Sequence, residues 1–365
     1  MTERAGHLRY FAATLPGLGK LLETEIAERA GLEPEGELGH DGRADLAFFR
    51  VRRGARLDLD MLRLAEDVFV VIADAPLGPP GRLAVALIDR RGLERALSTW
   101  TRMVRHLNPS MTFRVITRVV DERRFKRTEL REAVTKAVAA NRTRWRIADP
   151  AELEIWVLEY RQAQFVAGLR LSDRRMRQHG SGRAEERLGA LRPVVAAAMV
   201  RLAGEPHGRL LDPCCGSGTI LNEALGVGWT ALGSDLDPDA VEIARVNVPG
   251  AVIEHADVCG LPHPDGSFDA VVTNFPFGKQ FRVDADSEKW VIQALAEIAR
   301  VTRPGGRVVV LVPPPVLGDP PGLTLSGVHP LHLLGVPTRI WAYDRDDTRI
   351  RYADTRTAKT ATSPQ

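Results

Sequence analysis

Apolar runs alternate with segments of helical periodicity from Gly208 onward, and this alternation constrains the fold more than any other feature of the chain. Strands are predicted within residues 208–218, 230–237, 251–258, 268–278 and 306–313, and helices within residues 219–228, 238–248 and 287–304. Apolar strands separated by helices are typical of a parallel sheet covered on both faces. Residues 191–345 are therefore predicted to form an α/β domain, opened by a helix at 191–203 and closed by a strand pair at 331–345.

The first half of the chain predicts two smaller α+β modules. Residues 1–58 carry a strand, a helix and a strand, and residues 59–172 carry four strands and two helices. In the pair of strands at 151–160 and 164–171, apolar and polar residues alternate as in a half-buried antiparallel pair. Residues 173–190 are polar and basic and predict a linker, and residues 346–365 predict a disordered tail.

The composition excludes several classes of protein. Of 365 residues, 44% are hydrophobic and 27% are charged, as in globular domains. No apolar run approaches the roughly 18 residues of a membrane span, and the start lacks the apolar segment of a signal peptide. Three cysteines provide neither a disulfide framework nor paired zinc ligands. A cytoplasmic chain without metal or membrane contact is expected.

Charge is distributed unevenly along the chain. Residues 102–192 hold 21 Lys and Arg against 11 Asp and Glu, whereas residues 204–312 hold 8 against 15. A basic region favours a nucleic-acid partner over the alternative of solvated surface arginines.

The segment "LLDPCCGSGTI" places Asp212 and then Gly216-Ser217-Gly218 between a strand and a helix. This is the ligand position of an open α/β sheet, where glycines let the backbone approach a ligand. Leu221 stands where the dinucleotide fingerprint requires a small residue, and a carboxylate at Asp212 would repel phosphate. The predicted ligand therefore lacks phosphate and carries an ammonium group.

Two further acids end the next strands. Asp235 can accept bonds from ribose hydroxyls, and Asp257 can reach an adenine amino group. Each acid alone could equally be a strand-end cap or a surface residue. Their shared location at the carboxyl ends of adjacent strands favours S-adenosylmethionine, which combines ammonium, ribose and adenine without phosphate.

The segment "VVTNFPFGK" ends the fourth predicted strand beside the same cleft. The side-chain carbonyl of Asn274 and the backbone carbonyl of Phe275 can both accept from one exocyclic amine and so align its lone pair for methylation. Phe277 offers a flat face to an unstacked base, and Gly278 leaves room for it. The alternative is a strand exit whose two aromatic side chains fold into the core.

"DPCCGSGTIL" with "NFPFG" resembles the THUMP-containing class I RNA methyltransferases, which make N2-methylguanosine. "ATLPGLGKLLETEI" is similar to their N-terminal ferredoxin-like module, and residues 113–172 are similar to their THUMP domain. The resemblance covers residues 8–345 and implies a Rossmann-like domain with a seven-stranded sheet. A departure is Phe275, where many relatives have proline; the backbone acceptor survives this change.

The resemblance also implies roles for individual residues. Asp212, Gly216 and Gly218 would hold the methionine part of the cofactor, Asp235 its ribose and Asp257 its adenine. The predicted cofactor site further includes Pro213, Ser217, Thr219, Leu236, Val258 and Asn274. The predicted catalytic and target-base residues are Asn274, Phe275, Pro276 and Phe277.

The THUMP domain of the family grips the single-stranded 3′ end of tRNA. The corresponding RNA-binding candidates here are Arg114, Arg118, Arg123, Arg124, Lys126, Arg127, Arg174, Arg175 and Lys279. The prediction is a monomeric tRNA guanine-N2 methyltransferase, with the acceptor-stem members most similar. Methylation of ribosomal RNA, adenine-N6 methylation of nucleic acid, and a non-catalytic RNA-binding or assembly role stay open, as does mono- versus dimethylation.

Overall fold

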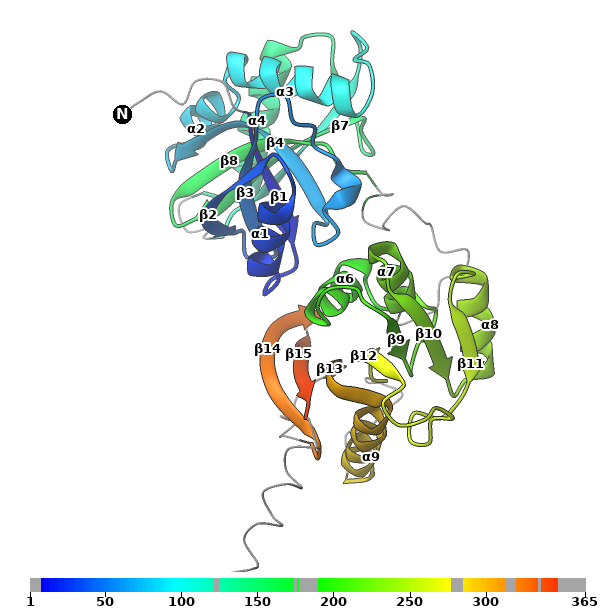
Figure 1. The fold of residues 1–365 in the computed structure, drawn as a ribbon. Coiled ribbons are helices and arrows are strands. Elements are labelled where there is room, and N and C mark those ends of the chain that lie inside the picture. Colours follow the sequence, from blue (N-terminus) through cyan, green and yellow to red (C-terminus); the bar gives the residue numbers. More distant parts are fainter. Residues whose placement is uncertain are drawn as a thin grey trace, which may run out of the picture. The chain divides into compact units, whose positions relative to one another are not determined.

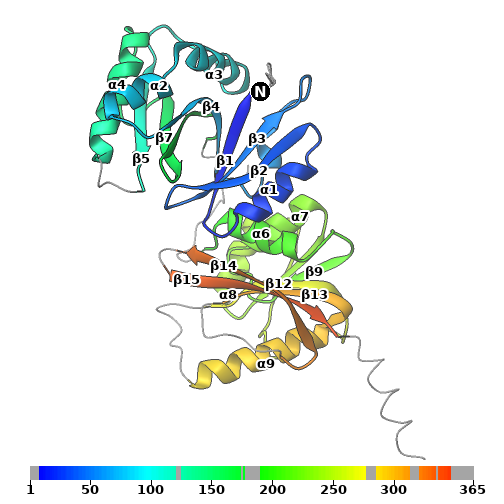
Figure 2. The same cartoon turned by 90° about the vertical axis from the view of Figure 1, so that its left-hand side faces the viewer.

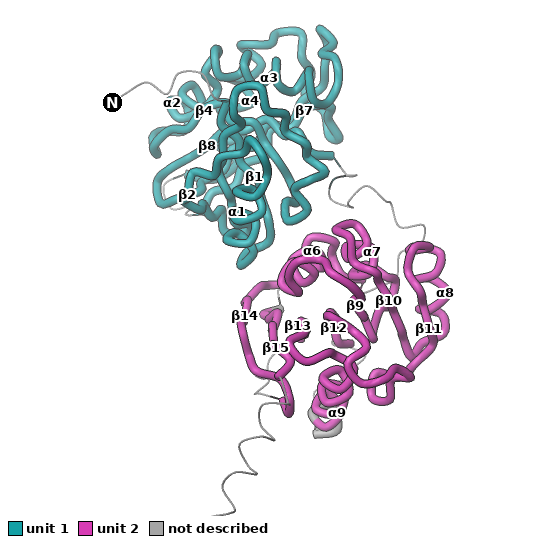
Figure 3. Tube along the Cα trace, in the orientation of Figure 1, with its two compact units in different colours: residues 1–182 teal, residues 183–365 magenta. Residues whose placement is uncertain are grey.

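A computed structural model describes residues 8–120, 125–173, 176, 190–276, 285–312, 320–333 and 336–346. The chain divides into two compact units, residues 1–182 and residues 183–365 (Figure 3). Each unit is built around one sheet with helices packed on it, so the predicted α/β class is confirmed. No helix in the described part of the chain is long and apolar enough to cross a bilayer.

The N-terminal unit contains an eight-stranded sheet in the order β2-β3-β1-β4-β8-β7-β5-β6. Neighbouring strands are antiparallel except that β5 runs parallel to both β6 and β7. The strands are β1 (Arg9–Thr14), β2 (Leu32–His40), β3 (Asp45–Val51), β4 (Asp67–Pro76), β5 (Thr112–Arg118), β6 (Arg146–Ile147), β7 (Leu153–Arg161) and β8 (Gln164–Arg170).

Strand β4 joins the two modules predicted for this half of the chain. It pairs with β1 on one side and with β8 on the other, so residues from both modules share one sheet. Their side chains also share one core. The Phe11 ring stacks on Phe69 with centroids 4.5 Å apart, and Phe69 in turn contacts Trp156 at 5.4 Å.

Within the described residues, this sheet is accompanied by α1 (Gly19–Glu28), η1 (Leu59–Met61), α2 (Pro80–Leu87), α3 (Arg90–Met103) and α4 (Arg127–Asn141). Helix α1 packs on β2 and β3, α3 on β4, and α4 on β5 and α2. Asp89 caps α3 by accepting a bond from the backbone N–H of Gly92 at 2.7 Å.

The C-terminal unit contains a seven-stranded sheet in the order β11-β10-β9-β12-β13-β15-β14, as the resemblance implied. Strands β9 to β13 are mutually parallel, and β15 is antiparallel to both β13 and β14. The strands are β9 (Arg209–Asp212), β10 (Thr230–Asp235), β11 (Val252–His255), β12 (Phe268–Asn274), β13 (Thr302–Val312), β14 (Leu323–Leu333) and β15 (Val336–Arg345).

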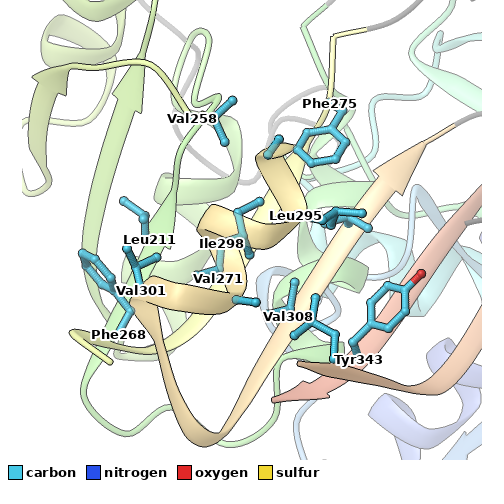
Figure 4. Close-up of a cluster of buried hydrophobic side chains, with 14 of the residues drawn as sticks. Leu211, Val258, Phe268, Val271, Phe275, Leu295, Ile298, Val301, Val308 and Tyr343 are labelled. Atoms are coloured by element: carbon cyan, nitrogen blue, oxygen red, sulfur yellow. The ribbon is translucent and has the colours of Figure 1, made fainter. Parts of the chain in front are cut away.

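Helices cover both faces of this sheet. Helices α6 (Pro193–Leu202) and α7 (Thr219–Val227) lie on one face and α9 (Ala285–Val301) on the other (Figures 1 and 2). Helix α8 (Pro238–Asn247) packs on β10 and β11. Leu295 and Ile298 of α9 share a buried cluster with Val271 of β12 and Val308 of β13 (Figure 4).

The strand order reverses between β9 and β12. Successive strands from β9 run outward through β10 to β11, whereas β12 pairs on the other side of β9 and leads to β13. At such a switch point the loops that leave neighbouring carboxyl ends diverge to opposite faces and open a crevice. The fold therefore selects the ends of β9 and β12, at Asp212 and Asn274, as the position of a ligand site.

Candidate functional site

The glycine turn that follows β9 is held in a conformation that other residues rarely adopt. Gly216 and Gly218 have φ angles of 51° and 84°. A Cβ on Gly218 would lie 2.6 Å from Cγ2 of Val248, whereas a Cβ on Gly216 would meet nothing within 4 Å. The turn is thus packed at Gly218 and open at Gly216, which gives a ligand access to the backbone.

Leu221, which stands where a dinucleotide fingerprint has its third small residue, is part of the core. Leu221 of α7 is fully buried. A Cβ on Gly233 of β10 would lie 2.4 Å from Cδ1 of Leu221, so the glycine on the strand makes room for the leucine on the helix. Sequence reasoning identified Leu221 but not Gly233.

Asp212 ends β9 with its carboxyl group buried; the residue is 1% exposed. Oδ1 accepts bonds from the Thr273 hydroxyl at 2.8 Å and from the backbone N–H of Cys214 at 3.2 Å. Within the described residues no Lys, Arg or His lies within ion-pair distance of it. Burial raises the pKa of Asp212 to about 7, which a nearby cation would counteract. A ligand with an ammonium group would supply that missing charge.

Asp235 ends β10 and fixes the turn. One carboxylate oxygen accepts from the backbone N–H of Gly216 at 2.8 Å, and the other accepts from Asp237 N–H at 3.0 Å. Each oxygen keeps a further lone pair for a hydroxyl group. Beside it, the Leu236 side chain is 63% exposed and offers an apolar surface.

Asp257 lies farther from its strand than the sequence suggested. Strand β11 ends at His255, and Asp257 follows in an exposed turn whose Cys259 N–H donates to its carboxylate at 2.9 Å. Val258 next to it is buried. The structure thus places Asp257 in the loop beyond β11.

Asn274 ends β12 on the strand next to Asp212. Its Oδ1 atom is buried and has no hydrogen-bond partner among the residues that the structure describes. Leaving such an acceptor unpaired costs about 1–3 kcal/mol, so native proteins seldom do so without a reason. The hydroxyl of the neighbouring Thr273 donates to Asp212. Thr273 and Asn274 therefore connect the predicted cofactor site to the predicted target-base site.

The aromatic residue that follows has a structural role. Phe275 is 2% exposed and belongs to the buried cluster of Figure 4. Its ring contacts Trp290 of α9 with centroids 5.3 Å apart. Its backbone N–H donates to Leu311 on β13 at 3.3 Å. The core-exit interpretation thus applies to this side chain, while Pro276 is exposed and Phe277 lies outside the described residues.

The two adjacent cysteines pack beside the turn. Cys215 is buried, and its backbone N–H donates to the Ser234 carbonyl at 2.9 Å. Burial raises the pKa of both the Cys214 and the Cys215 thiol, so both stay protonated. In the described part of the chain, no three His, Cys, Asp or Glu side chains are grouped as metal ligands.

The predicted RNA-binding arginines on β5 have acidic partners. Arg114 pairs with Glu154 and Asp149, and Arg118 pairs with Asp41 at 2.7 Å. Lys126 and Arg127 are exposed at the start of α4. The remaining candidates, Arg123, Arg124, Arg174, Arg175 and Lys279, lie outside the described residues.

Comparison with known proteins shows what the chain is similar to. Residues 181–314 match the family described as UPF0020: RMKL-like, methyltransferase domain. The crystal structure of TrmN from Thermus thermophilus superposes with a TM-score of 0.73 at 26% identity, over 93% of this chain and 100% of that chain. The predicted resemblance to class I methyltransferases is confirmed.

Curated relatives share this part of the sequence. A demethylmenaquinone methyltransferase of Thermus thermophilus is 40% identical over 117 residues, 30% of this chain and 50% of the relative. The U6 snRNA (guanine-N(2))-methyltransferase THUMPD2 of Bos taurus is 34% identical over 140 residues, 36% of this chain and 27% of the relative. The tRNA (guanine(6)-N(2))-methyltransferase THUMP3 of Bos taurus is 33% identical over 145 residues, which are 33% of this chain and 28% of the relative. The chain thus spans half or less of each relative's length.

Proposed function

We propose that this chain transfers the methyl group of S-adenosylmethionine to the exocyclic N2 amine of a guanosine in RNA, with tRNA as the substrate. The observation that carries the proposal is the buried Oδ1 of Asn274 at the carboxyl end of β12, which has no hydrogen-bond partner among the described residues. It lies at the switch point of a methyltransferase sheet, next to the residue that bonds Asp212.

The residues around the turn suit the cofactor. The Asp212 carboxylate would accept from its ammonium group, and the open side of Gly216 admits its methionine part. Asp235 retains lone pairs for the ribose hydroxyls, and Leu236 offers an apolar contact for adenine. Bound there, S-adenosylmethionine supplies an electrophilic methyl group. S-adenosylmethionine carries no phosphate group, so the Asp212 carboxylate, which precedes the glycine turn, would not repel it.

Asn274 would orient the acceptor amine. Its Oδ1 accepts one N–H and the Phe275 carbonyl accepts the other, so the nitrogen lone pair is directed away from both acceptors. Alignment of this kind contributes more than acid–base chemistry here, because the amine needs no base before transfer and loses its proton afterwards. The anchored Phe275 ring fixes the backbone that presents both acceptors.

The substrate assignment rests on two supports. Two relatives are named as guanine-N2 methyltransferases of RNA, and the chain is basic between residues 102 and 192. The demethylmenaquinone relative makes a quinone the main alternative substrate. Methyl transfer to a carbon atom would not require the hydrogen-bond acceptor of Asn274.

The test is transfer of a labelled methyl group with four acceptors: an unmodified tRNA transcript, U6 snRNA, duplex DNA and demethylmenaquinone. Nuclease digestion and mass spectrometry are expected to identify N2-methylguanosine in the tRNA arm. Label found only in the quinone, or only as N6-methyladenine, would refute the proposal. An Asn274→Ala variant serves as the inactive control, and intact tRNA mass distinguishes one methyl group from two.

A further inference from the structure

Helix α9 holds the loop that joins β11 to β12. This loop spans residues 256–267 and carries Asp257, whose predicted partner is the adenine of the cofactor. Glu297 and Arg300 lie one turn apart on the same face of α9, and both bond the loop directly. We call these two residues the α9 pair. They support a predicted part of the cofactor site, although neither is among the residues predicted to touch the cofactor.

The guanidinium group of Arg300 fixes the path of the loop. It donates to the backbone carbonyls of Leu261 at 3.0 Å and His263 at 2.8 Å, and to the Asp265 carboxylate at 2.7 Å. The backbone carbonyl of Arg300 also accepts from the N–H of Gly266 at 2.9 Å. One residue of α9 thus bonds the loop at several successive points.

Glu297 connects this guanidinium group to the start of the held segment. Its Oε1 accepts from the backbone N–H of Leu261 at 2.8 Å and from Arg300 at 2.6 Å, and its Oε2 accepts from Nε of Arg300 at 2.9 Å. The hydrogen bonds between the two side chains lower the pKa of Glu297 and raise the pKa of Arg300. The α9 pair therefore stays ionised across the neutral pH range and holds both the N–H and the carbonyl of Leu261.

The held segment begins directly after the turn of Asp257. The Asp257 carboxylate accepts from the N–H of Cys259 at 2.9 Å, and its backbone carbonyl accepts from the N–H of Gly260 at 3.0 Å. Leu261, the next residue along the chain, is the one that the α9 pair grips on both sides of its peptide backbone. The position of the Asp257 carboxylate therefore depends on the α9 pair.

A carboxylate at this position can distinguish one purine from another. Adenine carries an amino group at its 6-position, whereas hypoxanthine carries a carbonyl oxygen there. An ionised Asp257 that accepts one backbone bond still has lone pairs for the amino group, but it would repel the carbonyl. Sites built around such a hydrogen bond reject the analogue that lacks the donor, provided that the acceptor is held at bonding distance.

We propose that Glu297 and Arg300 are positioning residues that set the preference of the cofactor site for adenine, by holding the turn of Asp257 in place. The inference rests on the proposed binding of S-adenosylmethionine and is independent of the methyl acceptor.

Calorimetry on the full chain tests it with S-adenosylhomocysteine and S-inosylhomocysteine, which carries hypoxanthine in place of adenine. The wild-type chain should bind the adenosyl ligand about tenfold or more tightly than the inosyl ligand, because one bond to a charged group is worth that much. Arg300→Met keeps the length of the side chain and removes its donors. It should weaken adenosyl binding about tenfold and change inosyl binding less than about twofold, so the preference for adenine should nearly disappear.

Arg245→Met is the matched control. Arg245 of α8 also pairs with a glutamate one turn away, Glu242 at 2.5 Å, and also donates to a backbone carbonyl, that of Ile253 in β11 at 3.0 Å. Its bonds reach the strand and not the loop, so this variant should keep the preference for adenine. Glu297→Gln keeps an acceptor for the Leu261 N–H and removes the charge opposite Arg300, so it should reduce the preference in the same direction by a smaller factor.

A role of the α9 pair in general stability predicts a different pattern. Equal losses of both ligands in Arg300→Met, or a preference that both α9 variants retain, would overturn the inference while leaving the proposed cofactor in place. An equal loss of preference in Arg245→Met would overturn it as well. A wild-type chain that binds neither ligand would overturn both the inference and the proposed cofactor.

Discussion

Each unit of the molecule buries an aspartate, and the two aspartates are satisfied in different ways. Asp41 in the N-terminal unit is 3% exposed and pairs with the Arg118 guanidinium at 2.7 Å, in addition to two backbone N–H groups of its own turn. Asp212 in the C-terminal unit is buried as deeply, but among the described residues it accepts only from Thr273 and Cys214.

We propose that this contrast distinguishes a structural charge from one that binds a ligand. A buried carboxylate with its own arginine completes an internal network, whereas one without a cation keeps a raised pKa and remains available to a charged ligand. The unpaired Oδ1 of Asn274 belongs to the second kind. Burial alone therefore does not point to a ligand site; what supports the proposed site is that a buried carboxylate without a cation and a buried amide oxygen without a donor end neighbouring strands.

The largest expected effect concerns this unpaired amide. Asn274→Ala should lower the methyl-transfer rate about 10²–10³-fold, the loss typical of one preorganised acceptor or donor, because the amine loses its alignment. Affinity for S-adenosylmethionine, measured by calorimetry, should stay within about twofold.

Asn141→Ala is the matched control, since the Asn141 amide donates within its own helix to Ala137. Methyl transfer by Asn274→Ala at the wild-type rate would mean that the buried acceptor has no catalytic role and that the comparison with Asp41 has been misread.

Replacing each aspartate by asparagine should change stability in opposite directions. Asp41→Asn removes the charge opposite Arg118 and should destabilise the N-terminal unit by about 2–4 kcal/mol, because it leaves a partly buried arginine uncompensated. Asp212→Asn removes a carboxylate that has no cation in the described part of the chain and should stabilise the C-terminal unit at pH 8.

The pKa of Asp212 determines the sign of the stability change that Asp212→Asn should cause. The folded pKa of about 7 lies above the ordinary value of 3.8, so ionisation favours the unfolded chain as the pH rises through this range. The gain from Asp212→Asn should therefore grow between about pH 4 and pH 7, at about 1.4 kcal/mol per pH unit, and then level off. Urea unfolding monitored separately for each unit measures both variants; destabilisation by both would contradict the comparison.

Cofactor binding should carry the same pH signature. Only the ionised Asp212 attracts an ammonium group, so affinity for S-adenosylmethionine should rise roughly tenfold from pH 6 to about 7.5. Above about pH 8 it should fall as the amino group of the ligand loses its proton. Asp212→Asn should bind S-adenosylmethionine weakly, and its affinity should no longer rise between pH 6 and about 7.5, the acidic limb of the binding profile. An unchanged acidic limb in that variant would assign the titration to another group.

How far the sequence predicts this molecule depends on the distance between the residues that cooperate. The turn at Gly216 to Gly218 is encoded by residues close together in sequence. Its predicted position, and the seven-stranded sheet predicted around it, therefore agree with the structure. Strand β2 was not predicted, because its Pro34, Gly36 and three glutamates hide the alternation of an edge strand.

Long-range pairing accounts for most of what the sequence did not reveal. The single sheet of the N-terminal unit depends on β4 pairing with both β1 and β8, which no local pattern announces. Arg114 and Arg118 were predicted to bind RNA because they are basic, and their partners Glu154 and Asp41 lie 40 and 77 residues away in sequence. Whether they also reach RNA stays a prediction.

The smallest expected effect tests Thr273, which the sequence did not single out because its partner Asp212 lies 61 residues away. Thr273 is fully buried, and its hydroxyl is the side-chain donor that Asp212 has in the described structure. Thr273→Val keeps the shape and removes this bond, which is worth about 0.5–1.5 kcal/mol. Affinity for S-adenosylmethionine at pH 7 should fall about 2- to 10-fold.

The acidic limb of the binding profile should also move to higher pH in Thr273→Val, because the ionised carboxylate loses a donor while the negative charge of Asp235 continues to oppose ionisation. Thr273→Ser restores the hydroxyl and should restore both the affinity and the limb. Thr302→Val removes another buried hydroxyl of the same sheet, bonded to the Ile298 carbonyl at 2.7 Å, and should leave the profile in place. A limb that moves equally in both valine variants would show that Asp212 responds to general loosening of the sheet and not to the donor on the neighbouring strand.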